Sequence, residues 1–220
     1  MKKNTIFIFV LILFVVVSLI CLNKKTNFQE IINSSVIYIE SVSDETINNC
    51  SGFVYDITDN NAYIVTAYHC VDNVNEIYVY NMSKEKEKAI IDTYDLNNDI
   101  AILSIENNLS LKKIKISNKV PNVGNEIFVI GTPLDINYSG TLTHGVVSYV
   151  DRKVSLKKEN GIVTYNTIQI DAPISGGNSG SVLVDSKGKA IGMVIIKDDN
   201  LDGISFAIPI NKVIELKTYN

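Results

Sequence analysis

From about residue 31 onward, the chain is a series of short β-branched and aromatic runs separated by clusters of Asn, Asp, Ser and Gly. Runs of this kind, closely and regularly spaced, are typical of β-barrels and β-sandwiches. The segment is long enough for one large barrel or for two small six-stranded ones. Only residues 210–216 look helical. The predicted strands are residues 36–39, 52–55, 62–66, 76–80, 101–105, 126–130, 145–150, 164–170, 181–184, 190–196 and 204–208.

The N-terminus has a different pattern, because an uncharged apolar run fills residues 6–22 after a short basic start. Such a run can nearly span a bilayer as a helix, and its flanks suit either a cleaved signal peptide or an uncleaved anchor. Residues 18–21 faintly resemble a lipoprotein cleavage box, although Ile20 is too bulky for it. We expect residues 1–22 to be a transmembrane signal anchor or a signal peptide, and residues 23–30 to be a linker.

Each of these outcomes places the remainder of the chain outside the cytoplasm. An uncleaved anchor gives a single-pass protein of the cell membrane, bound to the membrane through its N-terminal helix, with an extracytoplasmic domain. A cleaved segment gives a secreted protein or a lipoprotein.

Charge and composition exclude some partners. The formal charge is −4 and the pI is near 5.2, which argues against a nucleic-acid-binding protein, since these usually carry a basic domain or stripe. Lys84, Lys86 and Lys88 alternate with glutamates and predict a solvated loop. With two histidines and three cysteines, no spacing suits a zinc site, so we expect neither metal nor cofactor.

Three polar residues lie where strand runs meet turns. His69 follows a strand run, Asp99 precedes one, and Ser179 lies in the glycine-rich loop 175–181. Each feature alone is usually structural. Together they meet the needs of nucleophilic catalysis, because a serine hydroxyl needs an adjacent base and that base needs a carboxylate to fix its tautomer. We predict a catalytic triad of Ser179 as nucleophile, His69 as base and Asp99 as its orienting partner.

The loop around Ser179 also predicts a site for an oxyanion. Glycine lets the backbone approach a ligand closely and adopt positive φ. Backbone N–H groups in such a loop can stabilise the negative oxygen of a tetrahedral intermediate. We predict that the N–H groups of Gly177 and Ser179 form this oxyanion hole.

The same segments resemble those of the chymotrypsin-like serine proteases, and they occur in that clan's order of His, Asp and Ser. Residues 66–70 (T-A-Y-H-C) resemble T-A-x-H-C, residues 98–103 (N-D-I-A-I-L) resemble N-D-I-A-x-L, and residues 177–181 (G-N-S-G-S) resemble G-[DN]-S-G-[GS]. Within the clan the likeness is closest to the HtrA/Deg branch. It extends to residues 130–134, 143–148, 169–174 and 203–209.

The resemblance implies an all-β fold of two six-stranded antiparallel β-barrels with a short C-terminal helix. A trypsin-like serine protease domain would occupy residues 31–220. Barrel 1 would span about residues 31–118 and supply His69 and Asp99, and barrel 2 would span about residues 119–220 and supply Ser179. The triad would then lie in the cleft between the barrels.

The sequence departs from the resembled proteins in two ways. HtrA proteins usually carry PDZ domains after the protease, whereas this chain ends just after the expected helix. We therefore expect no control by such a domain unless another chain supplies it. Digestive enzymes of the clan have Asp before the serine, which pairs with a newly freed N-terminal amine. Here Asn178 carries no charge, so we expect no activation of that kind.

The resemblance also suggests a specificity pocket. Pro173 stands six residues before Ser179, where trypsin-like enzymes carry their P1-reading Asp. The mostly apolar walls favour a small or medium aliphatic P1 residue, although apolar pockets discriminate by only about 1–3 kcal/mol per methylene. The candidate walls are Pro173, Ile174, Ile195, Ile196, Ile204 and Ser205. His144 is expected to be structural or solvent-exposed, the alternative being a substrate-side role near the oxyanion loop.

Two of the three cysteines stand at positions that form a disulfide in many chymotrypsin-like enzymes. Cys50 begins a strand and Cys70 follows His69, whereas Cys21 belongs to the apolar N-terminal run. HtrA proteins usually lack this bridge, but an extracytoplasmic location permits it. We expect Cys50 and Cys70 to be bonded, the alternative being two buried thiols.

The sequence predicts a serine endopeptidase that acts on exposed or unfolded polypeptide segments. The alternative is a catalytically inactive protease fold retained as a binding module. Hydrolysis of small esters is weaker as a hypothesis, because no G-x-S-x-G elbow is present. No residue predicts the oligomeric state.

Overall fold

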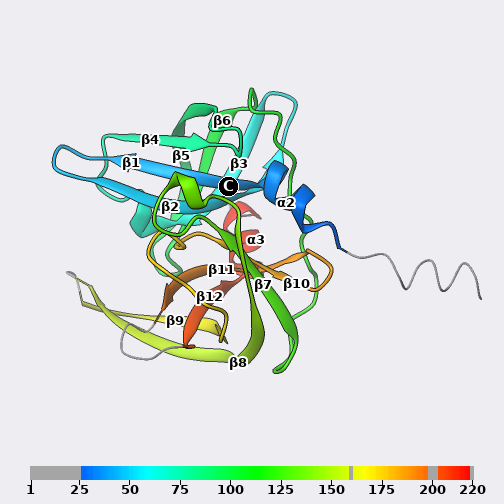
Figure 1. The fold of residues 1–220 in the computed structure, drawn as a ribbon. Helices are drawn as coiled ribbons and strands as arrows, with labels where there is room; N and C mark the ends of the chain where they lie inside the picture. Colours follow the sequence, from blue (N-terminus) through cyan, green and yellow to red (C-terminus); the bar gives the residue numbers. More distant parts are fainter. Residues whose placement is uncertain (1–25, 159–160, 198–202, 219–220) are drawn as a thin grey trace, which may run out of the picture.

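The computed structural model describes residues 26–158, 161–197 and 203–218. Within them the chain forms two closed six-stranded barrels, and every strand pairs antiparallel with its neighbours. Figure 1 shows one barrel above the other, with the N-terminal helix beside the upper barrel. The predicted all-β, two-barrel fold is therefore confirmed. The apolar run within residues 1–22 lies outside the described residues.

Barrel 1 closes in the order β1-β2-β3-β6-β5-β4. Alternate side chains of its strands point inward, and Phe53, Ile64 and Leu103 are fully buried there. Its strands are β1 (Val36–Val42), β2 (Ile47–Ile57), β3 (Asn61–Ala67), β4 (Glu76–Tyr80), β5 (Lys86–Asp95) and β6 (Ile100–Glu106).

Barrel 2 closes in the order β10-β11-β12-β9-β8-β7. Ile127, Ile170 and Leu183 are fully buried in its own core. The boundary expected near residues 118 and 119 falls within the connection from β6 to β7. The strands are β7 (Glu126–Gly131), β8 (Thr141–Lys158), β9 (Gly161–Ile170), β10 (Val182–Asp185), β11 (Ala190–Lys197) and β12 (Ser205–Pro209).

A continuous apolar cluster crosses the junction between the two barrels. Val182, Met193 and Ile208 of barrel 2 belong to the same buried cluster as the interior of barrel 1. The C-terminal helix α3 (Ile210–Thr218), which includes the predicted helix, packs against β11 and β12 and also against β5 of the other barrel. Burial of apolar surface across this junction fixes how the barrels sit against each other.

One α-helix and one strand were not expected from the sequence. Helix α2 (Phe28–Ser35) begins within the predicted linker. It is capped by Asn27, whose side chain accepts a hydrogen bond from the Glu30 N–H at 3.3 Å. Its apolar residues Phe28, Ile31 and Ile32 pack against the barrel core. The N-cap asparagine was the local signal for this helix.

The other unexpected element is strand β5, which begins in the charged segment predicted as a solvated loop. That prediction was wrong about the secondary structure, because residues 86–88 pair with β4. Lys88 Nζ lies 2.8 Å from Glu76 Oε1 on β4, and this hydrogen bond raises the pKa of Lys88. Most side chains of β5 face solvent, so the strand lacks the alternation of apolar and polar residues that marks a half-buried strand.

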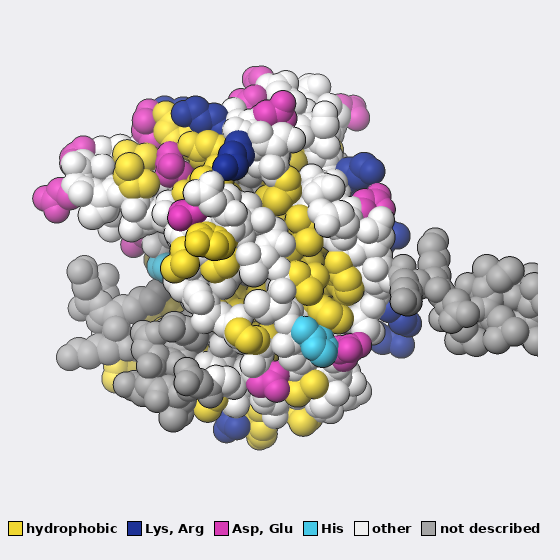
Figure 2. All heavy atoms as spheres, in the orientation of Figure 1, with side chains coloured by type: hydrophobic (Ala, Val, Ile, Leu, Met, Phe, Trp, Pro, Cys, Tyr) yellow, Lys and Arg dark blue, Asp and Glu magenta, His cyan; other side chains and the backbone are white. Residues whose placement is uncertain are grey.

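The described residues contain no helix with the length and hydropathy needed to cross a bilayer. On the face shown in Figure 2, apolar side chains gather along the middle of the molecule, and charged side chains lie mainly around its edge.

Candidate active site

His69 lies in a short 3₁₀ turn, Tyr68–Cys70, directly after strand β3. Two contacts of Tyr68 hold this turn in place. Its N–H donates to the Asp99 carbonyl at 2.9 Å, and its hydroxyl donates to Asp72 Oδ1 at 2.9 Å. Desolvation, together with the hydrogen bond to Asp72, raises the pKa of Tyr68 to about 12. Tyr68 therefore remains a neutral donor across the physiological pH range.

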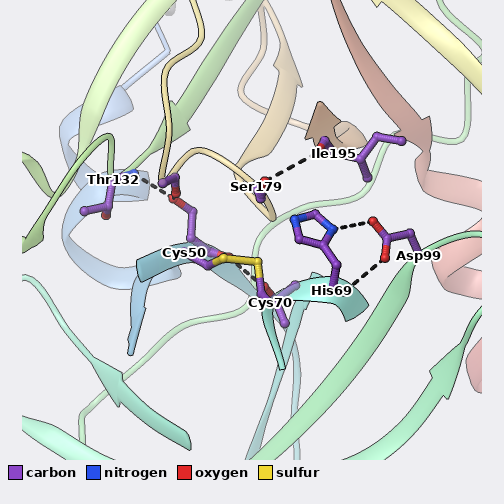
Figure 3. The surroundings of a disulfide bond; sticks show 10 residues. Cys50, His69, Cys70, Asp99, Thr132, Ser179 and Ile195 are labelled. Atoms are coloured by element: carbon purple, nitrogen blue, oxygen red, sulfur yellow. Dashed lines mark hydrogen bonds and ion pairs between the residues drawn. A yellow bond between two sulfur atoms is a disulfide. The ribbon is translucent and has the colours of Figure 1, made fainter. Parts of the chain in front are cut away.

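A disulfide joins the same turn to strand β2. Cys50 and Cys70 are bonded, with their Cα atoms 6.2 Å apart, and both side chains are buried. The predicted bridge is therefore present. Because Cys70 follows His69 directly, the bridge ties the backbone of the histidine to the core of barrel 1 (Figure 3).

Asp99 contacts His69 at two points. The carboxylate oxygen Oδ2 lies 2.6 Å from His69 Nδ1, and Oδ1 accepts from the His69 N–H at 3.0 Å (Figure 3). Asp99 is only 4% exposed and has a φ of 55°, a conformation that Asp tolerates better than most residues. The contact with Nδ1 fixes the orientation of the ring and favours a proton on Nδ1, which leaves Nε2 able to accept a proton. The bond from the main-chain N–H holds the carboxylate in place for that contact.

Ser179 lies in the loop between β9 and β10, whose shape depends on glycines with positive φ. Gly177 has a φ of 87° and Gly180 a φ of 85°. A Cβ on Gly180 would collide with the Ser51 carbonyl oxygen and would lie 2.6 Å from Thr66 Oγ1. Only glycine allows the loop to approach barrel 1 this closely.

The Ser179 hydroxyl is hydrogen-bonded to a main-chain oxygen and not to its predicted partner. It donates to the carbonyl of Ile195 on β11 at 3.3 Å (Figure 3). Within the described chain no hydrogen bond joins Ser179 Oγ to His69. The structure thus brings His69 and Asp99 into direct contact and positions Ser179 beside them, with its hydroxyl held by a main-chain oxygen.

The predicted oxyanion donors lie within residues 176–179, whose carbonyls all accept hydrogen bonds. The carbonyl of Gly176 accepts from Leu134 N–H at 2.7 Å, that of Gly177 from Ser51 Oγ at 2.8 Å, and that of Ser179 from Ser51 N–H at 2.9 Å. Among the described residues, no acceptor is hydrogen-bonded to the N–H groups of Gly177 and Ser179. Both are therefore free to donate to an added oxygen.

The residues predicted to line a specificity pocket do not share one environment. Ile195 and Ser205 are each only 3% exposed, so neither offers much side-chain surface to a ligand. Ile174 is half-buried against the barrel 2 core. Ile204 is half-buried and Pro173 is exposed. The side chain of Ile196 lies outside the described part of the chain.

His144 and Asn178 each have a local partner. His144 Nε2 lies 3.0 Å from Glu126 Oε1, and its ring packs on Phe128 with the centroids 4.8 Å apart. Both polar side chains are about half exposed, which agrees with a structural role at the surface. Asn178 is buried, and its amide oxygen accepts from Ser181 Oγ at 3.2 Å.

Sequence reasoning missed Ser51, Thr132 and the Ile195 carbonyl. Thr132 N–H donates to Ser51 Oγ at 2.7 Å, and the same oxygen donates to the Gly177 carbonyl. The one local signal for Ser51 was its place beside Cys50. The other contacts join segments that are far apart in the chain, so no short motif marks them.

A family model for the trypsin-like peptidase domain matches residues 50–193. The chain belongs to the trypsin-like peptidase family. The matched segment includes all three predicted triad residues and both disulfide cysteines.

Relatives of this peptidase chain are HtrA-type serine proteases. The Do-like HtrA of Bacillus subtilis is 34% identical over 194 residues, covering 86% of this chain and 43% of that protein. The Do-like HtrA of Lactococcus lactis subsp. cremoris is 33% identical over 176 residues, which cover 76% of this chain and 43% of that protein. The chain thus spans less than half the length of these two relatives.

Solved structures show the same architecture. The active form of the Rv3671c protease from M. tuberculosis superposes with a TM-score of 0.78 at 21% identity, covering 88% of this chain and 83% of that one. The serine endoprotease from Yersinia pestis superposes with a TM-score of 0.73 at 26% identity, covering 88% and 66%. The first match supports the fold alone.

The disulfide leads to a stability prediction. Replacing both Cys50 and Cys70 with Ala should lower the free energy of unfolding by about 3 kcal/mol, because the bridge closes a loop of about 20 residues in the unfolded chain. Urea unfolding, followed by circular dichroism with and without dithiothreitol, measures the effect. Dithiothreitol should destabilise the wild-type chain to a similar extent and leave the double variant unchanged. Equal sensitivity of both chains to the reductant would contradict the prediction.

The close approach at Gly180 can be tested against a matched glycine. Gly124 has a φ of 81° and open space around the position of a Cβ. Gly124→Ala should therefore cost only the left-handed strain of about 1–2 kcal/mol. Gly180→Ala adds the collision with Ser51 and should be the more destabilising of the two in urea unfolding. Equal destabilisation by both substitutions would show that the approach of the loop to barrel 1 is not tight.

Proposed function

We propose that the chain is a serine endopeptidase that hydrolyses exposed or unfolded segments of polypeptides. The observation that carries the proposal is the direct contact between the buried Asp99 carboxylate and His69, beside a glycine-rich loop with two free N–H groups. Membership of a peptidase family and the likeness to HtrA proteases support the same reaction.

The proposed reaction begins with Ser179. Rotation about its side-chain torsion moves the hydroxyl from the Ile195 carbonyl toward His69 Nε2. Oγ then attacks the scissile carbonyl carbon while Nε2 accepts the hydroxyl proton, and Asp99 stabilises the resulting imidazolium through Nδ1. The carbonyl oxygen becomes an oxyanion, which accepts hydrogen bonds from the N–H groups of Gly177 and Ser179.

Collapse of this intermediate breaks the C–N bond, and Nε2 returns the proton to the leaving amine. Ser179 is left as an acyl ester. A water molecule then gives a proton to His69 Nε2 and attacks the ester, so that the acid is released and the Ser179 hydroxyl is restored. No step requires a metal or an organic cofactor.

The proposed substrate preference is a small or medium aliphatic P1 residue. It rests on Pro173, which stands six residues before Ser179 in place of an acidic residue, and on the apolar character of Ile174 and Ile204. The polypeptide partner is recognised by its backbone and by this side chain, which suits segments that are already extended.

We also propose an extracytoplasmic location, either as a single-pass membrane protein or as a secreted one. The apolar run after a basic start and the buried Cys50–Cys70 disulfide support it, because such bridges persist in oxidising compartments.

A second candidate function is a catalytically inactive, protease-like binding module. The hydrogen bond from Ser179 Oγ to the Ile195 carbonyl favours it, since a hydroxyl held there is not activated by His69. The intact His69–Asp99 contact argues against it, because a module that only binds has no need of an oriented base.

Loss of the nucleophile should abolish turnover. Ser179→Ala should lower kcat by about 10⁶-fold if the triad acts as a unit, and Asp99→Asn should lower it by about 10⁴-fold because the wrong imidazole tautomer is then favoured. Cleavage of fluorescently labelled casein and labelling by a fluorophosphonate probe measure both effects. A wild-type chain that neither cleaves casein nor reacts with the probe would support the binding module instead.

The P1 preference should appear in cleavage of a proteome-derived peptide library analysed by mass spectrometry. Residues such as Ala and Val should be enriched on the N-terminal side of the cut, and Arg and Lys should be depleted. The preference should be shallow, about 10- to 100-fold between neighbouring aliphatic residues. Enrichment of basic or acidic P1 residues would contradict the proposed pocket.

A further inference from the structure

Ser51 is a buried serine of strand β2 that joins barrel 1 to the loop carrying the nucleophile. It is fully inaccessible to solvent and pairs with Tyr38 on β1. Its own carbonyl accepts from Thr66 Oγ1 at 2.8 Å. The residue is thus held on two sides by barrel 1 before it makes any contact with barrel 2.

The hydroxyl of Ser51 uses both of its hydrogen-bonding functions across the barrel junction. It donates to the carbonyl of Gly177 at 2.8 Å and accepts from the N–H of Thr132 at 2.7 Å. The dashed line at Thr132 in Figure 3 marks the second bond. A hydroxyl has one donor and can accept at the same time, so both groups are satisfied by one oxygen in a place that water does not reach.

These bonds act on the peptide units that flank those supplying the oxyanion donors. The peptide plane between Gly177 and Asn178 separates the two N–H groups, and its carbonyl is held by Ser51 Oγ. The carbonyl after Ser179 is held by the Ser51 N–H at 2.9 Å. Because a peptide unit is planar, fixing a carbonyl also fixes the direction of the N–H in the same unit and limits rotation of its neighbours.

The Ser51 hydroxyl also helps to hold the first donor, the N–H of Gly177, through the loop after β7. The carbonyl in the peptide unit of the Gly177 N–H belongs to Gly176 and accepts from Leu134 N–H at 2.7 Å. Leu134 follows Thr132 by two residues, and Thr132 is bonded to Ser51 Oγ. One oxygen therefore links the loop after β7, which holds the first donor, to the peptide plane between the two donors.

We propose that Ser51 is a positioning residue for the oxyanion hole, whose hydroxyl holds the N–H groups of Gly177 and Ser179 in the direction that a tetrahedral oxyanion requires. The inference rests on the proposed peptidase function and adds to it a residue outside the triad. Ser51 itself touches no substrate. Its effect passes through the Gly177 carbonyl and through the bond to Thr132.

A positioning role differs from a purely structural one in what it changes. Loss of preorganised donors weakens binding of the tetrahedral state and leaves binding of the ground-state substrate largely intact. A peptide boronic acid with an aliphatic P1 residue forms a tetrahedral adduct with a serine Oγ and places an oxygen in the oxyanion hole. Its affinity therefore reports on the donors separately from the stability of the fold.

The experiment compares Ser51→Ala with Ser35→Ala in the full chain. Ser35 is a matched control, because it is also buried and its hydroxyl also donates to a carbonyl, that of Lys112, at 2.8 Å. It lies at the end of helix α2, outside the site. Hydrolysis of a peptide anilide with the same P1 residue gives kcat and KM, the boronic acid gives an inhibition constant, and thermal unfolding gives Tm.

Ser51→Ala should lower kcat by about 10- to 100-fold, less than the 10²- to 10³-fold cost of removing an oxyanion donor outright. KM should stay within about 3-fold, and the boronic acid should weaken by about the same factor as kcat/KM, since both report on the tetrahedral state. Ser35→Ala should lower Tm to a similar extent yet keep kcat within about 2-fold of wild type.

Equal kcat values for the two alanine variants, or a fall in kcat with unchanged boronic acid affinity, would overturn the inference while the proposed function stands. If Ser51→Ala fails to fold, Ser51→Thr takes its place as the test of the inference, because it retains the hydroxyl. A folded Ser51→Thr chain should keep boronic acid affinity within about 3-fold of wild type, and a larger loss would contradict the role of the hydroxyl. A wild-type chain inert toward both the anilide and a fluorophosphonate would instead contradict the proposed function itself.

Discussion

The pair of residues Cys50 and Ser51 holds the two halves of the site to one strand. Cys50 is bonded to Cys70, the residue after His69, and Ser51 is hydrogen-bonded to Gly177, Ser179 and Thr132. A base from barrel 1 and a nucleophile from barrel 2 must meet to within a few tenths of an ångström. Both are attached to consecutive residues of β2. Few contacts therefore separate the base from the nucleophile, and their relative position is closely defined.

The state of Ser179 follows from this arrangement. The contact of His69 with Asp99 is complete, and the N–H groups of Gly177 and Ser179 are free in the described chain, yet the serine hydroxyl bonds to the Ile195 carbonyl at 3.3 Å. A distance of that length is at the weak end for a hydroxyl donor. Release of the hydroxyl therefore costs little, and rotation about a single torsion is fast compared with enzymatic turnover. The proposed mechanism requires no rearrangement of the backbone around Ser179.

Local sequence patterns predicted the elements whose character depends on near neighbours. Most strands alternate or form buried runs, and the segments around His69, Asp99 and Ser179 are short and contiguous, so they could be identified directly. Strand β5 was missed because most of its side chains face solvent and its place is set by pairing with β4 and β6. Helix α2 was missed because it is short and begins in a polar stretch, where only Asn27 marks its start.

The part of the site that could not be predicted is the part made by distant contacts. Ser51 bonds to Thr132 across 81 positions and to Gly177 across 126, and such pairs exist only after both barrels have closed. The Ile195 carbonyl is likewise a main-chain group, which the sequence of side chains does not specify. Of the residues predicted to line the specificity pocket, Ile195 belongs to the buried core, and it is its carbonyl that contacts Ser179.

The loop after β7 provides a further connection between the glycine-rich loop around Ser179 and barrel 1. The Leu134 N–H holds the Gly176 carbonyl, and the Leu134 carbonyl in turn accepts from Asn49 Nδ2 at 3.2 Å. Further along the loop, Asn137 Oδ1 accepts from Lys84 Nζ at 3.0 Å. Barrel 1 thus supports the oxyanion segment both directly, through Ser51, and through the loop. Because these supports cross the barrel junction, a local opening there would disorder the oxyanion donors while leaving His69 and Asp99 in contact within barrel 1. In the proposed mechanism, catalytic competence therefore depends on the docked barrels as well as on the triad.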